Sequence, residues 1–335
     1  MAPPMTYTHD KDSSRLSVAP MMAWTDRHCR YFHRRLAPSA LLYTEMVTTG
    51  AVLHGDRERL LAYNPEEHPV ALQLGGSEPA DLAASAKVAV DYGYDEINLN
   101  VGCPSDRVQK GRFGACLMKE PDTVRDGLKA MADVVDVPVT VKTRLGVDEL
   151  YSYDYFRDFV GRVTDGTGVD TVIAHARIAF LAGLSPKENR DVPPLHHDWV
   201  YRLKQEMPHL TVVLNGGVET VDQVTEHLAQ VDGVMLGRAA YHDPWVLARC
   251  QHALLGGGGP EAPEDVLPAM TAYLERLATA GVPVKHATRH MLGLFGGQPG
   301  ARAWRRYLSE NAHRDDADTG LLDGALAAMR EVQAA

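Results

Sequence analysis

Short apolar runs alternate with helix-like stretches along most of this chain, and this alternation restricts the fold more than any other feature. Eight runs are expected to form strands, at residues 18–22, 40–46, 70–74, 96–102, 139–145, 171–175, 211–215 and 233–236. Most are followed by a predicted helix, at residues 26–36, 79–92, 122–135, 153–164, 199–207, 220–228 and 244–251. Strands that alternate with helices indicate βαβ units and a parallel sheet.

Eight strand–helix units within about 230 residues favour a closed (β/α)8 TIM barrel over an open doubly wound α/β sheet. The open sheet also lacks its usual marker. No GxGxxG motif follows the first strand, where the chain instead has Pro20, Met21, Met22 and Trp24. That sequence cannot act as a glycine-rich phosphate loop. Residues 1–251 are therefore predicted to form the barrel domain.

The character of the sequence changes after residue 251. A Leu-Leu-Gly-Gly-Gly-Gly-Pro run occupies 254–260 and is followed by helix-like segments at 264–280, 284–295, 302–311 and 319–332, with no strand signal among them. Glycines and an Asp-Asp pair separate these segments. We expect residues 252–335 to form a small helical bundle as a second domain.

Composition excludes several classes of protein. Of the 335 residues, 45% are hydrophobic and 23% charged, which is typical of a globular protein. A net charge of −10 argues against a nucleic-acid partner unless a local basic face outweighs the total. The four cysteines lack the close spacing of a disulfide framework or zinc site, and neither an export signal nor a membrane span is visible. We expect a cytoplasmic protein with reduced thiols and no metal; a monomer is compatible with this sequence.

Polar residues gather at the predicted strand ends, where TIM barrels carry their active sites. Lys142 and Arg144 alternate on one strand, so both should face the barrel interior or its mouth, where cations need an anion. His175 and Arg177 show the same spacing. Asn215-Gly216-Gly217 and Gly237-Arg238 end the seventh and eighth strands. Either glycine cluster alone is more often a plain tight turn, but both together predict a phosphate pocket.

Cys103 ends the fourth predicted strand, between Gly102 and Pro104. A cysteine at a strand end is usually a small buried hydrophobic residue. Asn98 and Asn100 give this one a polar environment, however, and a thiol that keeps its proton at neutral pH can act as a general acid as well as a nucleophile. The sequence therefore makes Cys103 the candidate catalytic cysteine.

Several motifs together resemble the tRNA-dihydrouridine synthases. They are Pro20-Met21-Met22-x-Trp24-Thr25-Asp26, Asn98-Leu99-Asn100-Val101-Gly102-Cys103-Pro104-Ser105, Val141-Lys142-Thr143-Arg144, His175-Ala176-Arg177 and Asn215-Gly216-Gly217. The segments 184–190 and 300–309 resemble the DusA subfamily, whose members act on positions 20 and 20a of tRNA. Ala23 departs from the subfamily, which usually has an aspartate beside the flavin-binding methionines.

The resemblance implies an FMN-bearing barrel that uses NADPH to reduce D-loop uridines of tRNA to dihydrouridine. It implies an FMN site of Pro20, Met21 and Met22 at the isoalloxazine, Gln73 and Lys142 at its polar edge, His175 near the ring, and Asn215, Gly216, Gly217, Gly237 and Arg238 at the phosphate. Hydride would pass from reduced flavin N5 to uracil C6, and Cys103 would protonate C5. Asn100 would hydrogen-bond the uracil edge of a base extruded from the tRNA.

Contacts to tRNA are expected in the sixth βα loop and on the C-terminal helices. Lys187 and Arg190 match the subfamily's RNA-contacting segment, and Arg302 and Arg305 share one helix face beside Trp304. A charge run of this kind is often only a solvated face. Two other functions remain open from the residues alone: a flavin barrel that reduces a free pyrimidine or other small molecule, and a non-enzymatic RNA-binding module.

Overall fold

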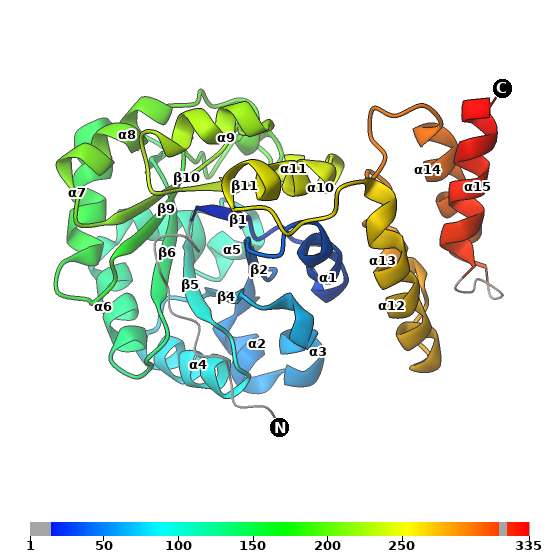
Figure 1. Cartoon of the computed structure of the whole chain (residues 1–335). Helices are drawn as coiled ribbons and strands as arrows, with labels where there is room; N and C mark the ends of the chain where they lie inside the picture. Colours follow the sequence, from blue (N-terminus) through cyan, green and yellow to red (C-terminus); the bar gives the residue numbers. More distant parts are fainter. Residues whose placement is uncertain (1–14, 315–319, 335) are drawn as a thin grey trace.

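The computed structural model describes residues 15–314 and 320–334 as a barrel with a helical domain at one side (Figure 1). The barrel strands are β1 (Leu16–Val18), β2 (Leu41–Tyr43), β4 (Val70–Gly75), β5 (Glu96–Val101), β6 (Val139–Arg144), β9 (Thr171–His175), β10 (Thr211–Asn215) and β11 (Gly233–Leu236). All neighbours are parallel, and β2 pairs with both β1 and β4, which closes the sheet. The predicted TIM barrel is confirmed.

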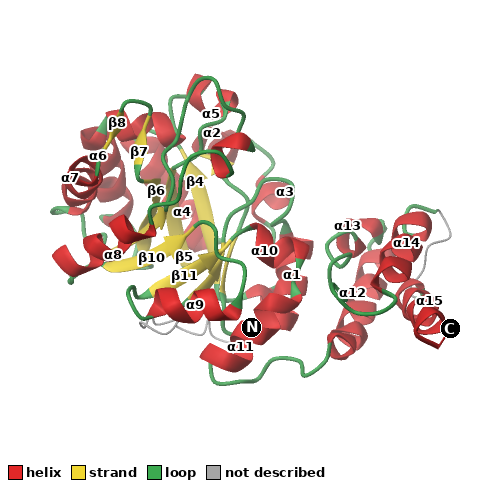
Figure 2. Ribbon diagram, turned by 90° about the horizontal axis from the view of Figure 1, so that it is seen from above, coloured by secondary structure: helices red, strands yellow, loops and turns green. Residues whose placement is uncertain are grey.

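Helices surround the barrel, as Figures 1 and 2 show. They are α1 (Arg27–Leu36), α4 (Pro79–Asp91), α6 (Pro121–Ala132), α7 (Tyr153–Thr164), α8 (His197–Glu206), α9 (Val221–Leu228), α10 (Arg238–His242) and α11 (Trp245–Leu254). Local sequence explains several of their starts. The Asp26 carboxylate accepts the backbone N–H groups of His28 and Cys29, and proline occupies the first turn of α4 and α6.

The structure differs from the sequence-based expectation near the first two strands. β1 ends at Val18 instead of running from 18 to 22, and the residues after Pro20, which has no N–H to donate, form a loop at the barrel mouth. β2 ends at Tyr43, and a separate short strand, β3 (Val47–Thr48), pairs with β4. Short helices fill the region of weak signal that follows: α2 (Thr49–His54), α3 (Arg57–Leu61) and the 3₁₀ turn η1 (Pro65–Glu67).

Other short elements decorate the loops at the ends of the strands. They are α5 (Asp106–Lys110), η2 (Gly114–Lys119), the hairpin of β7 (Gly146–Val147) and β8 (Leu150–Tyr151), and η3 (Glu188–Arg190). In the part of the chain that the structure describes, no helix is both long and apolar enough to cross a membrane.

The C-terminal region contains η4 (Pro263–Val266), α12 (Leu267–Thr279), α13 (Lys285–Thr288), α14 (Ala301–Asn311) and α15 (Leu321–Ala334). The segment 284–295 is helical only over α13, and residue 319, where the last helix was expected to begin, lies outside the described residues, as do the domain limits 1 and 335. Helix α11 continues past the expected boundary at 251 to Leu254. The division into domains 1–251 and 252–335 stays a prediction.

Strand β5 shows how the barrel separates its two faces. Ile97, Leu99 and Val101 point outward into the apolar core that the strands share with the helices. Glu96, Asn98 and the cavity-lining Asn100 alternate with them, and all three are buried. Inside the barrel, a small apolar cluster is formed by Ala19, Leu41, Tyr43, Ala71, Ile173, Val213 and Met235. The interior is therefore part apolar packing and part buried polar side chains.

Candidate active site

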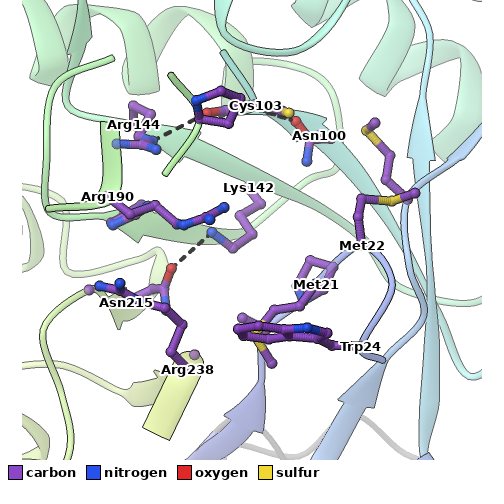
Figure 3. Close-up of a pocket in the computed structure, with 18 of the residues that line it drawn as sticks. Met21, Met22, Trp24, Asn100, Cys103, Lys142, Arg144, Arg190, Asn215 and Arg238 are labelled. Carbon is purple, nitrogen blue, oxygen red and sulfur yellow. Dashed lines mark hydrogen bonds between the residues drawn. The ribbon is translucent and has the colours of Figure 1, made fainter. Parts of the chain in front are cut away.

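A cavity of about 470 Å³ opens at the C-terminal ends of the barrel strands (Figure 3). Its walls include every residue that the sequence suggested for a flavin, together with Cys103, Asn100 and Arg190. Those flavin candidates are Pro20, Met21, Met22, Gln73, Lys142, His175, Asn215, Gly216, Gly217, Gly237 and Arg238. Residues distant in sequence meet here because parallel strands all end on the same rim. Their roles in binding stay predictions.

The loop after β1 forms one wall of the cavity, where Figure 3 shows Met21, Met22 and Trp24 on one side. Thr25 Oγ1 accepts the N–H of Met21, and the Met21 carbonyl accepts the N–H groups of Trp24 and Thr25. Ala23 has a left-handed backbone, with φ of +64°, and its N–H donates to Glu45 Oε1 at 2.5 Å. The loop is therefore held through its backbone at Ala23.

Cys103 stands at the cavity wall just after β5. Asn100 Oδ1 accepts the backbone N–H groups of Gly102 and Cys103 at 3.1 and 3.0 Å, and the Cys103 carbonyl accepts the N–H of Ala115 at 2.9 Å. A Cβ on Gly114 would lie 2.6 Å from that carbonyl oxygen, so the close approach requires glycine. These contacts fix the backbone on both sides of the thiol. The side chains of Cys29 and Cys250 are by contrast buried in α1 and α11.

Lys142 lies near the centre of the cavity, where its Nζ donates to Asn215 Oδ1 at 3.0 Å (Figure 3). Burial, and after it the adjacent Arg144 cation, lower the pKa of Lys142 to about 7, while Cys103 acts in the opposite direction. Burial likewise lowers the pKa of Arg144 to about 10 and holds the pKa of His175 well below its usual value. Within residues 15–314 and 320–334, neither Lys142 nor Arg144 forms an ion pair, so the site favours an anion.

Glycines shape the far side of the cavity, after β10 and β11. Gly216 and Gly217 have φ of +110° and +75°. A Cβ on Gly216 would lie 2.7 Å from Cδ2 of His175, and one on Gly217 would lie 2.4 Å from Cδ1 of Leu195. Arg238 follows Gly237 and donates to Asp191 Oδ1 at 2.6 Å in a partly exposed ion pair. The backbone here forms a cradle that side chains would fill.

Some predicted residues lie elsewhere. Lys187 is exposed and does not line the cavity, and Arg302 and Arg305 are exposed on α14. Arg177 was expected to share a face with His175, but β9 ends at His175, so strand alternation stops there and Arg177 donates to the backbone carbonyls of Asp191 and Pro193.

Three aromatic or basic side chains of the helical domain contribute to the fold. Trp304 is fully buried and its Nε1 donates to the Met291 carbonyl at 3.0 Å, so it is a core residue of the helical domain. His290, also buried, and Arg289 both contact the carboxylate of Asp26 at the start of α1. These contacts connect the helical domain to the barrel.

A second cavity, of about 790 Å³, adjoins the first and reaches the helical domain. Both cavities are lined by Met22, Met46, Cys103 and Ser105, so they meet at the thiol. Val282 and His286 contribute from the C-terminal region, and Arg27 and Arg59 contribute from the barrel side. A large ligand that rests against the helical domain therefore has a route to Cys103.

Comparisons with known proteins identify the group to which this site belongs. A family model described as dihydrouridine synthase (Dus) matches residues 17–332. The chain belongs to the Dus family. A protein of Xanthomonas campestris named tRNA-dihydrouridine(20/20a) synthase is 59% identical over 97% of this chain and 96% of its own length. Proteins of the same name from Vibrio vulnificus and Escherichia coli K12 are 55% and 57% identical, each over 94% of this chain and over 97% and 91% of their own lengths.

Some Dus-cavity residues had no role assigned from sequence. Arg144 and Trp24 both line the cavity and both belong to motifs that the sequence singles out. Arg144 is 3% exposed and donates to the carbonyls of Gly102 and Asn189, which ties it to the Cys103 segment. Its same-face spacing with Lys142 was the available signal. No sequence signal pointed to Tyr241, because it lies on α10, far from Trp24 in the sequence. Its ring stacks on that of Trp24 with 4.3 Å between the ring centroids.

Proposed function

We propose that this chain is an FMN-dependent tRNA-dihydrouridine synthase that uses NADPH to reduce D-loop uridines at positions 20 and 20a, acting in the cytoplasm. Membership of the Dus family and the printed names of its relatives support the reaction. The observation that carries the assignment is one cavity that holds the Cys103 thiol, the Lys142 amine and a glycine cradle together. This reduction needs a proton donor, a cation that can bind an electron-rich cofactor, and a recess for a phosphate group, and the three features supply these in that order.

Several features of the cavity support the proposal that it binds FMN. The space beside Gly216 and Gly217 is one that a Cβ would obstruct, as expected where a phosphate lies against backbone N–H groups. Lys142 lacks an anionic partner among the described residues, and the electron-rich edge of a flavin would supply one. Met21 and Met22 offer soft apolar side chains for the ring. Gln73, His175, Asn215, Gly237 and Arg238 complete the proposed cofactor site.

The reduction of uracil adds a hydride to C6 and a proton to C5. When bound, FMN supplies the hydride, which originates from NADPH. Cys103 donates the proton to C5 and is left as a thiolate. The cations of Lys142 and Arg144 stabilise that thiolate, since an opposite charge nearby favours the ionised form. Asn100 hydrogen-bonds the uracil ring and holds it against the thiol.

The tRNA reaches this site along the second cavity. A uridine must leave its stack to enter the barrel, and the 790 Å³ space beside Cys103 admits the surrounding nucleotides. Arg190 at the cavity wall, Lys187 beyond it, and Arg302 and Arg305 on α14 contact the phosphate backbone in this proposal. In this proposal these four cations supply the local positive charge that a chain of net charge −10 needs to bind a nucleic acid.

The decisive experiment incubates the protein with FMN, NADPH and unmodified tRNA and maps dihydrouridine by position. We expect product at positions 20 and 20a and none from free uridine. Cys103→Ala should keep bound FMN and NADPH-dependent flavin reduction but lose product by about 10²- to 10⁴-fold, the usual contribution of a general acid. A colourless protein, turnover of free uridine, or normal product from Cys103→Ala would each contradict the proposal.

A further inference from the structure

A chain of buried hydrogen bonds runs beneath the cavity from a carboxylate inside the barrel. Glu96 on β5 is fully buried, and its Oε1 accepts the hydroxyl protons of Tyr43, at 2.5 Å, and Thr140, at 2.7 Å. A hydroxyl has one proton to give. Because Thr140 donates its proton to Glu96, it can only accept from its other neighbour, Asn98.

The order of donor and acceptor set at Thr140 continues from one amide side chain to the next. Asn98 Nδ2 donates to Thr140 Oγ1 at 2.8 Å, so Asn98 Oδ1 faces the other way and accepts Gln73 Nε2 at 2.8 Å. Gln73 Oε1 in turn accepts Asn100 Nδ2 at 2.9 Å. An amide has its acceptor and its donors on opposite sides of the group, so each orientation dictates the next.

The chain ends on the backbone of the catalytic segment. Because Asn100 Nδ2 donates to Gln73, Asn100 Oδ1 faces away from Gln73. It accepts two backbone N–H groups, those of Gly102 and Cys103. A reversed chain would place the Asn100 NH₂ group against these N–H donors and leave them unsatisfied. With both lone pairs used and one N–H spent on Gln73, Asn100 has a single N–H left for a ligand.

We propose that Thr140 is a positioning residue, which with Glu96 sets the amide directions of Asn98, Gln73 and Asn100 and thereby holds Cys103 in place. Thr140 does not line the cavity, so it acts through this chain alone. The arrangement also makes Asn100 a donor that selects a carbonyl acceptor on the ring it meets. This inference rests on the proposed function for the identity of that ring, and on the contacts alone for the position of Cys103.

The test compares Thr140→Val, which keeps the shape and removes the hydroxyl, with Thr140→Ser, which keeps the hydroxyl. The first readout is the rate at which iodoacetamide alkylates Cys103, followed by mass spectrometry of its peptide. We expect Thr140→Val to change this rate by about two- to tenfold, as for one lost hydrogen bond, and Thr140→Ser to restore the wild-type rate. The second readout is dihydrouridine formation, where Thr140→Val should lower kcat by roughly ten- to a hundredfold, with a smaller effect on KM.

Equal alkylation and equal kcat in wild type and a folded Thr140→Val protein would overturn the inference, as would a Thr140→Ser protein that behaves like Thr140→Val. Melting curves establish folding. If Thr140→Val does not fold, Glu96→Gln gives the same comparison, since it keeps the side-chain shape but replaces one carboxyl oxygen at the end of the chain with an NH₂ group; unchanged alkylation there would overturn the inference too. Should the wild type form no dihydrouridine, the proposed function fails, whereas the alkylation rates still decide the role of Thr140.

Discussion

Lys142 is an amine whose surroundings oppose its charge. Its pKa falls to about 7 because burial, and then the nearby Arg144 cation, disfavour the protonated form. In the unfolded chain the same amine keeps its proton up to about pH 10.4. The fold therefore holds a destabilising group in the middle of its cavity, which is typical of functional sites rather than of structural ones.

Lys142 predicts a pH dependence of stability for the FMN-free protein. Between pH 7 and 10 the unfolded chain binds more protons than the folded one, so the free energy of unfolding rises with pH, by at most about 1.4 kcal/mol per pH unit for one proton. Lys142→Met should remove this contribution. Melting temperatures of both proteins at pH 7 and pH 9 measure it. The melting temperature of the wild type should rise more from pH 7 to pH 9 than that of the variant. An equal gain in the variant would place the titration elsewhere. Lys142→Met should also weaken FMN retention.

Ala23 predicts a stabilising substitution in the cavity wall. Its φ of +64° lies in the left-handed region, which costs a residue with a Cβ about 1–2 kcal/mol but is tolerated by asparagine. Ala23→Asn should therefore raise the free energy of unfolding by up to about 1 kcal/mol, whereas β-branched Ala23→Val should lower it. Thermal unfolding of both variants checks the sign. A stabilised valine variant would show that the loop relaxes freely.

At the scale of elements, the ends of several strands contribute to the cavity, among them β5 and the loop after β10. The alternation that places Asn98 and Asn100 inward was visible in the sequence, since a strand has a period of two. The fold and the set of residues that gather at the barrel mouth followed from the same pattern, whereas the ends of β1 and β2 did not. The hydrogen bonds of Thr140 with Glu96, and the stacking of Tyr241 on Trp24, were not visible, because they join strands and helices that only the closed barrel brings together.

The loop after β10 predicts a local loss of binding. Gly216→Ala would push a Cβ to 2.7 Å from His175 and strain a backbone with φ of +110°, so it should weaken FMN binding by at least about tenfold. Gly166→Ala is the matched control: its φ is also positive, at +66°, but a Cβ there meets nothing within 4 Å. It should cost about 1 kcal/mol of stability and leave FMN binding intact. Fluorescence titration with FMN compares the affinities of the two variants. Equal affinities would contradict the proposal that the backbone at Gly216 binds the phosphate.

At the scale of the whole molecule, Asp26 joins the barrel to the helical domain. Its carboxylate caps α1 and contacts Arg289 at 2.5 Å and His290 at 3.0 Å. Burial raises the pKa of Asp26, but the contacts with His290 and Arg289 and the hydrogen bond from the Cys29 N–H outweigh it and leave the pKa well below its usual range. His28 and Tyr273 add a hydrogen bond of 2.7 Å across the same interface.

Asp26→Asn should loosen this interface without removing the helix cap, because asparagine also accepts backbone N–H groups. A carboxyl with a depressed pKa stabilises the fold above its unfolded pKa of about 3.9 and loses that contribution as the pH falls toward the folded value. The wild type should therefore lose more melting temperature than Asp26→Asn between pH 6 and pH 3. At pH 7 the variant should be cut faster by protease in the glycine-rich 254–260 linker; unchanged cleavage would assign the docking to other contacts.

The short segment from Met22 to Asp26 connects the cavity wall to the helical domain. Met22 is 60% exposed at the cavity edge, Trp24 stacks on Tyr241, and Asp26 holds the helical domain. The segment that contacts the helical domain through Asp26 therefore also forms part of the cavity wall through Met22 and Trp24. A displacement of the helical domain would therefore act on the cavity wall through Asp26. In the proposed function, the shape of the tRNA would thus bear on the cavity wall as well as the base that enters the cavity.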